Sequence, residues 1–250
     1  MIPKQRQEQI LALLKTEAYV TVKYLTRVLQ YSTATVNRDL NEMQAQGLIK
    51  RCRGGAEAVN GKLPPFATRQ FYMQKEKRRN AARAAQLIED GDTVFLDAST
   101  TVQHIVPFLP EKKDLTVITN SLFLAAELSK HSISVISLGG RVVESPYVLD
   151  GEDTVDRAMK YRADKMFFSV NGITPDGKVG TSHYLLHRVL LSNSGEAYLL
   201  TDRTKVSDTV KIVLCDFSRL AGVISDIDFP EETRIAYPGV RFIDSTDIKL

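Results

Sequence analysis

The chain has 250 residues, of which 43% are apolar and 25% charged, as in a soluble protein of one or two domains that can bury a core. No apolar run approaches the ~20 residues that span a bilayer, and the N-terminus lacks the apolar centre of a signal peptide, so we expect a cytoplasmic protein without a membrane partner. Cys52 and Cys215 have no second Cys or His at ligand spacing. This excludes a disulfide framework or zinc site, and we expect neither metal nor cofactor.

The net charge of +3 is distributed unevenly along the chain. Residues 1–83 contain 16 Lys and Arg against 6 Asp and Glu, whereas the rest of the chain contains 17 against 24. A basic N-terminal segment joined to an acidic body is typical of proteins that bind the phosphate backbone of a nucleic acid. A basic face that is merely solvated would give the same charge distribution.

The first sixty residues predict three short helices followed by two strands. Apolar residues at helical spacing predict a helix over 5–18, and a second over 22–29 with Thr21 as its N-cap. After a short turn, Ser32 or Thr33 caps a third helix, which ends at Gly47 and has on its inner face Val36, Leu40 and Met43. The following stretch "LIKRCRGGAEAV" predicts a strand, a Gly-Gly turn and a second strand, which together form a two-stranded wing.

Short polar side chains crowd the start of the third predicted helix, in the stretch "YSTATVNRDL". In a helix-turn-helix, the first turns of the second helix enter the major groove, where hydroxyls bind phosphates and Asn or Arg reads bases. The candidate DNA contacts are Ser32, Thr33, Thr35, Asn37, Arg38 and Asn41, with Arg51 and Arg53 on the wing. Taken alone, the hydroxyls could be helix caps and the remaining side chains a solvated face, but helix, turn, helix and basic wing together favour DNA binding.

A linker over 60–73 separates two predicted domains, 1–59 and 74–250. Pro64 and Pro65 exclude helix there. The basic stretch 75–88 then predicts a helix that runs towards Gly91 and opens the second domain. Beyond it, β-branched runs alternate with helical ones, which favours an α/β fold with an open, mostly parallel sheet and helices on both faces. We expect strands at 94–96, 115–118, 133–138, 166–170, 197–200, 222–224 and 240–243, and helices at 101–109, 122–129, 155–160, 185–194 and 231–237.

Polar residues follow most of these strands, at the sheet edge where ligands bind in such folds. Amides, hydroxyls and a cation suit a phosphate, and Asp or Asn suits sugar hydroxyls. Each short motif alone could be a cap, a turn or a solvated lysine, but together they favour a site for a phosphorylated small molecule. The candidates are Asp97, Ser99, Thr100, Thr101, Asn120, Ser121, Gly139, Arg141, Asn171, Gly172, Asp202 and Lys205.

The whole chain resembles a DeoR-type bacterial transcriptional regulator. "YSTATVNRDL" and "RCRGGA" resemble the winged-helix signature of that family, and "DGDTVFLDASTT", "VITNS", "LGG", "NGI" and "LLTDRTK" resemble successive landmarks of its effector domain. The resemblance implies a repressor of a sugar-catabolism operon that binds double-stranded operator DNA as a homodimer or homotetramer. It also implies an effector domain with a fold similar to ribose-phosphate isomerases and CoA transferases, which senses a phosphorylated sugar or related anionic metabolite.

Three residues of the matching motifs depart from the family pattern. Asn37 replaces the first of two usual arginines, which predicts a different operator preference or one phosphate contact fewer. Arg53 replaces a common wing histidine and keeps a positive charge there. Ser99 replaces a usual glycine, and its Cβ could hinder a phosphate that approaches the backbone closely.

A fourth departure is the stretch "GTSHYLLHRVL", where relatives usually carry acidic residues and a lysine. Here it contains His183, His187 and Arg188. One hypothesis is that the pocket accepts a more anionic ligand, because potential cations replace acidic groups. The alternative is a helix that has drifted in sequence without contacting the ligand.

Two other functions compete with the repressor. A sugar-phosphate isomerase with an attached DNA-binding domain could use Asp202 and Lys205, but the Glu that it would need on the neighbouring helix is not evident. An RNA-binding role fits poorly, because A-form RNA hides its major groove from a recognition helix. We therefore expect a regulator and not an enzyme.

Overall fold

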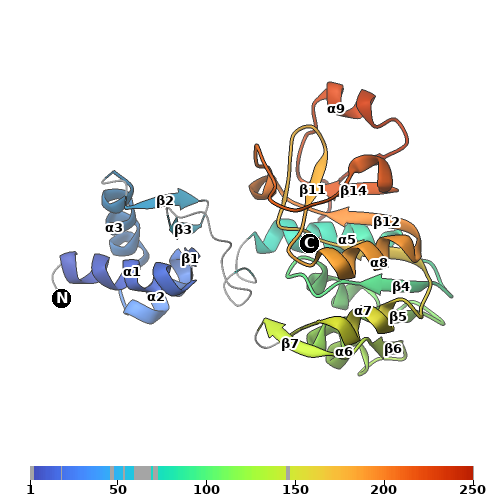
Figure 1. Cartoon of the computed structure of the whole chain (residues 1–250). Helices are drawn as coiled ribbons and strands as arrows, with labels where there is room; N and C mark the ends of the chain where they lie inside the picture. Colours follow the sequence, from blue (N-terminus) through green and yellow to red (C-terminus); the bar gives the residue numbers. More distant parts are fainter. Residues whose placement is uncertain are drawn as a thin grey trace. The chain divides into compact units, whose positions relative to one another are not determined.

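The computed structural model describes residues 3–17, 19–45, 48–52, 54–58, 69, 73–144 and 147–249 (Figure 1). Its contacts divide the chain into two compact units, Met1–Tyr72 and Met73–Leu250. Three sequence-based expectations fall outside the described residues, namely the helix end at Gly47, the wing residue Arg53 and the prolines of the predicted linker.

The first unit is a winged helix-turn-helix, as predicted. Thr21 caps the second helix by accepting a hydrogen bond of 2.9 Å from the amide of Tyr24. The elements are α1 (Pro3–Glu17), β1 (Tyr19–Thr21), α2 (Val22–Leu29), α3 (Thr33–Ala45), β2 (Ile49–Cys52) and β3 (Gly55–Ala58). They enclose one core, whose buried members are Ile10, Leu14, Val20, Leu25, Val36, Leu40, Met43, Ile49 and Ala56.

The two predicted strands of the wing are present as β2 and β3, and a third strand, β1, was not predicted. β1 pairs with β3, so the antiparallel order is β1-β3-β2. A strand of three residues is too short for its side chains to show a period of two, which is why the sequence did not reveal it. Its presence explains Gly55, because a Cβ at this position would lie 2.1 Å from the carbonyl oxygen of Val20.

The second unit is built on a seven-stranded parallel sheet, and all seven of its strands were predicted. In spatial order they are β15 (Arg241–Asp244), β14 (Gly222–Ser225), β12 (Ser194–Leu200), β9 (Ala163–Phe168), β4 (Thr93–Leu96), β5 (Thr116–Thr119) and β6 (Ser134–Ser137). The order runs outward in both directions from the pair β4 and β9, so the direction of chain progression reverses there.

Helices cover both faces of this sheet, again as predicted (Figure 1). One core contains sheet residues such as Val94 and Leu96 together with residues of α5 (Gln74–Gln86), η1 (Val102–Phe108) and α6 (Leu122–Leu128). The core on the other face contains Phe95 and residues of α7 (Glu152–Ala158) and α8 (Tyr184–Ser192). The alternation of Val94, Phe95 and Leu96 between the two cores follows from the two-residue period of a strand.

The remaining elements differ from the expectations or were missed, apart from α9, which was predicted. η1 is a 3-10 helix, whereas a regular helix was predicted, and it contains Pro107, which has no amide hydrogen to donate. Two small antiparallel sheets were not predicted. They consist of β7 (Arg141–Glu144) with β8 (Val148–Asp150), and of β10 (Gly172–Ile173), β11 (Lys178–Gly180) and β13 (Val213–Asp216). The last elements are η2 (Arg203–Lys205), η3 (Phe217–Arg219) and α9 (Glu231–Ala236).

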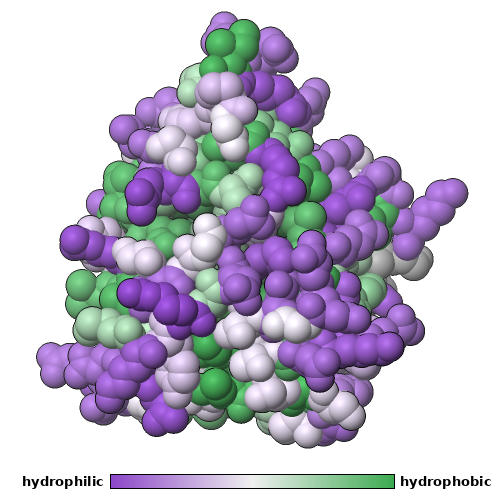
Figure 2. Space-filling view, turned by 90° about the vertical axis from the view of Figure 1, so that its right-hand side faces the viewer, coloured by the Kyte–Doolittle hydropathy of each residue, from purple (hydrophilic) through white to green (hydrophobic). Residues whose placement is uncertain are grey.

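The surface mixes hydrophilic and hydrophobic side chains. Figure 2 shows one side, on which hydrophilic residues cover much of the area and hydrophobic ones lie between them. Exposed apolar residues include Val142 on β7, Leu185 on α8 and Ile235 on α9. Among the described residues, no helix has the length and apolar character needed to cross a membrane. Nor do three or more His, Cys, Asp or Glu side chains of these residues gather where they could bind a metal ion.

A partly buried histidine makes the stability of the second unit depend on pH. Burial, with the charges of Lys77 and Arg78, lowers the pKa of His104 on η1 to about 4. Between pH 4 and 6.5 the unfolded chain therefore binds more protons at this residue than the folded one, so stability falls as the pH falls through that window. Because the ring is partly exposed, we expect a loss of only about 1–2 kcal/mol.

Urea denaturation at pH 7.5 and pH 5 checks this prediction. His104→Gln should lose less stability than the parent protein between the two pH values. The exposed His131 on the same unit provides the matched control, and His131→Gln should lose as much as the parent. An equal loss in all three proteins would contradict the assignment to His104.

Candidate functional site

The polar residues at the start of α3 lie on the face of the helix opposite the core. Val36, Leu40 and Met43 are buried, whereas Ser32, Thr33, Arg38 and Asn41 are exposed and Thr35 and Asn37 are half-buried. Ser32 caps the helix, because its hydroxyl accepts a hydrogen bond of 3.2 Å from the amide of Thr35. The exposed polar face leaves the first turns of α3 available to a groove of DNA.

The wing contacts this helix through Arg51 on β2. Its guanidinium donates hydrogen bonds to the side-chain oxygen of Asn41 at 2.9 Å and to that of Asn37 at 3.0 Å. The same group also donates to the backbone carbonyl of Asn37 at 3.3 Å. Three of the predicted DNA contacts therefore bind one another, and the guanidinium of Arg51 lies on α3.

A buried ion pair that the sequence analysis missed fastens α3 to α1. The guanidinium of Arg6 binds both carboxylate oxygens of Asp39, and one of these contacts measures 2.8 Å. The two residues are only 4% and 1% exposed. A signal was available, because Asp39 continues the helical spacing of Val36, Leu40 and Met43 and so places a charge on the apolar face.

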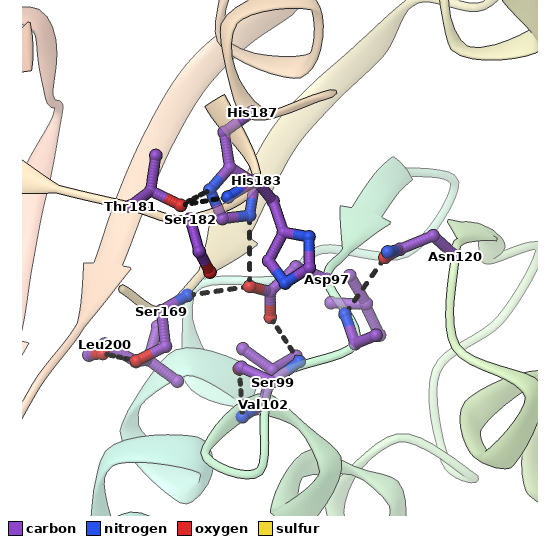
Figure 3. Close-up of polar contacts among 12 residues, drawn as sticks. Asp97, Ser99, Val102, Asn120, Ser169, Thr181, Ser182, His183, His187 and Leu200 are labelled. Carbon is purple, nitrogen blue, oxygen red and sulfur yellow. Dashed lines mark hydrogen bonds and ion pairs between the residues drawn. The ribbon is translucent and has the colours of Figure 1, made fainter. Parts of the chain in front are cut away.

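In the second unit the central polar group lies between β4 and β9, where the strand order reverses. Asp97 follows β4, and its carboxylate accepts hydrogen bonds of 3.0 Å from the amides of Ser99 and Ser169 (Figure 3). Ser169 follows β9. The switch point of an open α/β sheet is where such folds bind ligands, so these residues lie where the fold favours a site.

Two lysines bring positive charge to the same strand ends. The ammonium of Lys205, a predicted contact, donates to the hydroxyl of Ser169, and that hydroxyl donates to the carbonyl of Leu200 at 2.5 Å. Lys77 on α5 was not predicted, although it is buried and donates to the hydroxyl of Thr100 at 3.0 Å. It shares its helix face with alanines at i+4 and i+7, which distinguishes it from the exposed Lys75 of the same basic stretch.

A buried hydroxyl completes this group. Thr101 is fully buried, and its hydroxyl has no hydrogen-bond partner among the described residues. Native proteins satisfy nearly all buried polar groups, so an unpaired hydroxyl in the residue after Thr100, which binds Lys77, fits a site that takes an external acceptor or donor. Asp97, Ser99, Thr100, Thr101 and Lys205, with Ser169 and Lys77, are called the switch-point group below.

Three other predicted contacts have structural partners. The side chain of Asn120 accepts from the amide of Ala98 at 3.0 Å and donates to the carbonyl of Leu149 at 2.9 Å. Ser121 caps α6 by accepting from the amide of Leu124 at 3.2 Å. Asp202 caps η2 by accepting from the amide of Thr204 at 3.0 Å. These side chains hold the strand ends in place, which is the alternative role that short polar motifs usually have.

The last four predicted contacts lie in turns or small sheets. Gly139 has a φ of +67°, which favours glycine, and it belongs to the turn into β7, where Arg141 is exposed. The side-chain oxygen of Asn171 accepts a hydrogen bond of 2.5 Å from the amide of Ser182. Gly172 lies in β10 and pairs with Gly180 in β11.

Two of the three cationic departures, His183 and His187, lie side by side, with ring centroids 6.1 Å apart. His183 lies 2.6 Å from a carboxylate oxygen of Asp150, and its hydrogen bond is the main cause that lowers the pKa of Asp150. His187 is buried, with Nε2 3.5 Å from Asp97 and Nδ1 2.9 Å from the hydroxyl of Thr181 (Figure 3). Arg188 is exposed. Each imidazole has a carboxylate partner within the protein, and the hypothesis of a more anionic ligand stays a prediction.

Ser99 causes none of the backbone strain that a replaced glycine could leave. It is absent from the described non-glycine residues with positive φ, which are Gln30, Met73 and Asp114. Its hydroxyl accepts a hydrogen bond of 3.1 Å from the amide of Val102 at the start of η1. The side chain therefore serves as a local cap.

Comparisons with known proteins agree with this architecture. Residues 6–62 match the family model of the DeoR-like helix-turn-helix domain, and residues 73–227 match that of the DeoR C-terminal sensor domain. A ribose 5-phosphate isomerase from Methanocaldococcus jannaschii is similar over 54% of this chain and 55% of its own, with a TM-score of 0.41 and 16% identity. A similarity of this size says nothing about activity.

Curated relatives align along nearly the whole chain. The HTH-type transcriptional repressor GlcR of Bacillus subtilis is 33% identical over 90% of this chain and 89% of its own. The glycerol-3-phosphate regulon repressor of Escherichia coli is 29% identical over 90% of this chain and 92% of its own. These relatives are repressors and not isomerases. The chain therefore belongs to the DeoR family of helix-turn-helix transcriptional regulators, and it is a DNA-binding repressor with a C-terminal sensor domain.

Proposed function

We propose that α3 reads an operator and that a phosphorylated sugar-pathway intermediate, bound by the switch-point group, controls this binding. The protein would act on chromosomal DNA in the cytoplasm, as a homodimer or homotetramer that spans two half-sites. The effector would favour an arrangement that cannot span them, and would weaken operator binding by its coupling free energy, typically ~1–3 kcal/mol.

The observation that carries the effector assignment is the placement of Lys77 and Lys205 at the ends of adjacent strands. Their ammonium groups donate to hydroxyls of the segments that follow β4 and β9, and the unpaired hydroxyl of Thr101 lies in the first of these segments. Lysine is a common ligand of phosphate, and the carboxylate of Asp97 suits sugar hydroxyls. A relative named for the glycerol-3-phosphate regulon supports an effector of this class.

A binding selection on random duplex DNA, with and without a panel of sugar phosphates, tests the proposal. We expect one recovered motif with two half-sites, whose enrichment changes with one ligand of the panel. A motif that no phosphorylated sugar affects would contradict the effector assignment. Binding that depends on salt but recovers no motif would contradict sequence-specific recognition by α3.

The exposed Arg38 on α3 gives a sharper test of the DNA contact. If it binds phosphate, Arg38→Ala should weaken binding to every duplex sequence and lower the salt dependence by about one counterion. Fluorescence anisotropy at several salt concentrations measures both quantities. Arg219→Ala, which removes an exposed arginine of the sensor unit, is the matched control and should change neither. Identical binding by the two variants would remove Arg38 from the interface.

A further inference from the structure

We propose that Arg51 determines which base Asn37 and Asn41 read, because it holds their amide oxygens and leaves their N–H groups for the DNA. The inference rests on the proposed function, in which α3 enters the major groove. It assigns Arg51 a role in specificity that differs from the phosphate or minor-groove contact predicted from the sequence.

The contacts form a fork between the wing and the recognition helix. Asn37 and Asn41 are four residues apart and so project from the same side of α3. One guanidinium nitrogen of Arg51 lies 2.9 Å from the side-chain oxygen of Asn41, and the other lies 3.0 Å from that of Asn37. The strand is also held at this residue, because the side chain of Gln44 on α3 accepts a hydrogen bond of 2.8 Å from the amide of Arg51.

The orientation of both amides follows from chemistry alone. A guanidinium has five N–H donors and no acceptor, so only an oxygen can face it. A flipped amide would place its own N–H groups against those of Arg51. The contact therefore orients the Nδ2 hydrogens of Asn37 and Asn41 away from the guanidinium. Without Arg51, nothing in this contact would fix the orientation of the two amides.

This orientation changes what the two residues recognise. An unrestrained Asn reads adenine by accepting from N6 and donating to N7. With its oxygen held by Arg51, the side chain presents mainly donors, and guanine offers two acceptors, N7 and O6. If adenine N6 donated a second hydrogen bond to the same oxygen, the partly positive hydrogens of its amino group would lie beside the positive guanidinium of Arg51. The guanidinium would repel them. We therefore infer a preference for guanine over adenine at the two positions that these residues contact.

The test compares selected motifs for the parent protein, Arg51→Met and Lys50→Met. Arg51→Met keeps a long side chain but removes every donor, so the freed amides should shift the preference at these positions from guanine to adenine by about tenfold. Lys50 is the neighbouring exposed cation of the same strand, and its ammonium lies 3.1 Å from Glu57. Lys50→Met removes the same charge without touching α3 and should leave the motif unchanged.

The other outcomes show whether this inference alone is wrong or the proposed function is wrong as well. If Arg51→Met recovers the parent motif with weaker binding and a smaller salt dependence, Arg51 binds phosphate and the inference is wrong while the proposed function stands. If the parent protein recovers no motif, both are wrong. Thermal unfolding followed by circular dichroism shows whether Arg51→Met folds. If it does not, Arg51→Lys, whose single ammonium cannot hold both oxygens in the fork, should shift the preference towards adenine at one of the two positions.

Discussion

Arg6→Ala is expected to destabilise the first unit by about 3 kcal/mol and to reduce operator binding in parallel. The change leaves the carboxylate of Asp39 buried in α3 without its cation, and removing one partner of a buried pair costs far more than the pair contributes. It also removes the contact of the guanidinium with the ring of Tyr31, 4.7 Å away, in the turn before α3. Hydrogen exchange of α1 and α3 in the full chain measures the effect.

An exposed contact between the same two helices supplies the control. The side chain of Gln7, which is half-buried, donates a hydrogen bond of 2.9 Å to the exposed Glu42. Gln7→Ala should change stability by no more than about 0.5 kcal/mol. The double variant Arg6→Met, Asp39→Leu should recover most of the lost stability, since apolar side chains of similar size often replace a buried pair without cost. Equal protection from exchange in Arg6→Ala and Gln7→Ala would contradict a stabilising role for the pair.

The first unit shows what periodicity can and cannot predict. The helices were predicted because each has several apolar residues on one face and a polar cap, as Thr21 and Ser32 demonstrate. Asp39 was not predicted to be buried, because charged residues are rarely buried without a partner and its partner is not evident from the local sequence. Its partner Arg6 lies 33 residues earlier, and no local pattern links residues so far apart.

In the second unit, burial decided which strands could be predicted. Five of the seven parallel strands contain consecutive buried residues, as Phe167 and Phe168 do in β9, because both faces of the sheet are covered. The edge strands β6 and β15 are only partly buried, but each has apolar residues packed against both cores. The strands of the small sheets are two to four residues long, and β7 exposes Val142 and Val143. Such segments are too short to show an alternation, and among these described strands only β13 contains an apolar run of three residues, Val213 to Cys215.

The same limit explains the candidate effector site. The sequence located polar residues at strand ends but did not give the order of the strands, which alone decides that Asp97 and Ser169 are neighbours while Gly139 and Arg141 follow the edge strand β6. Nor could it separate a ligand contact from a cap. Asn120, Ser121 and Asp202 satisfy backbone groups, and the same residue types would be chosen for a phosphate or a sugar.

Asp97→Asn is expected to destabilise the second unit by about 2–3 kcal/mol and to weaken effector binding by at least about tenfold. The carboxylate accepts from the amides of Ser99 and Ser169 on different oxygens and lies 3.5 Å from Nε2 of His187. An Asn side chain has only one acceptor oxygen. Its N–H groups would therefore face one of the two backbone amides, of Ser99 or of Ser169, that now donate to the carboxylate. The lost hydrogen bond would loosen the segments that contain Thr100 and Ser169, and with them the contacts of both lysines.

Asp216→Asn separates this effect from the general cost of removing a capping carboxylate. Asp216 precedes η3 and accepts a hydrogen bond of 2.9 Å from the amide of Ser218, but it is exposed and belongs to a different sheet. Its replacement should cost less than about 1 kcal/mol and leave the response to sugar phosphates intact. Urea denaturation and ligand-induced release of operator DNA measure both effects. If Asp97→Asn released DNA at the parent's effector concentration, Asp97 would hold β4 to β9 without contributing to the binding site.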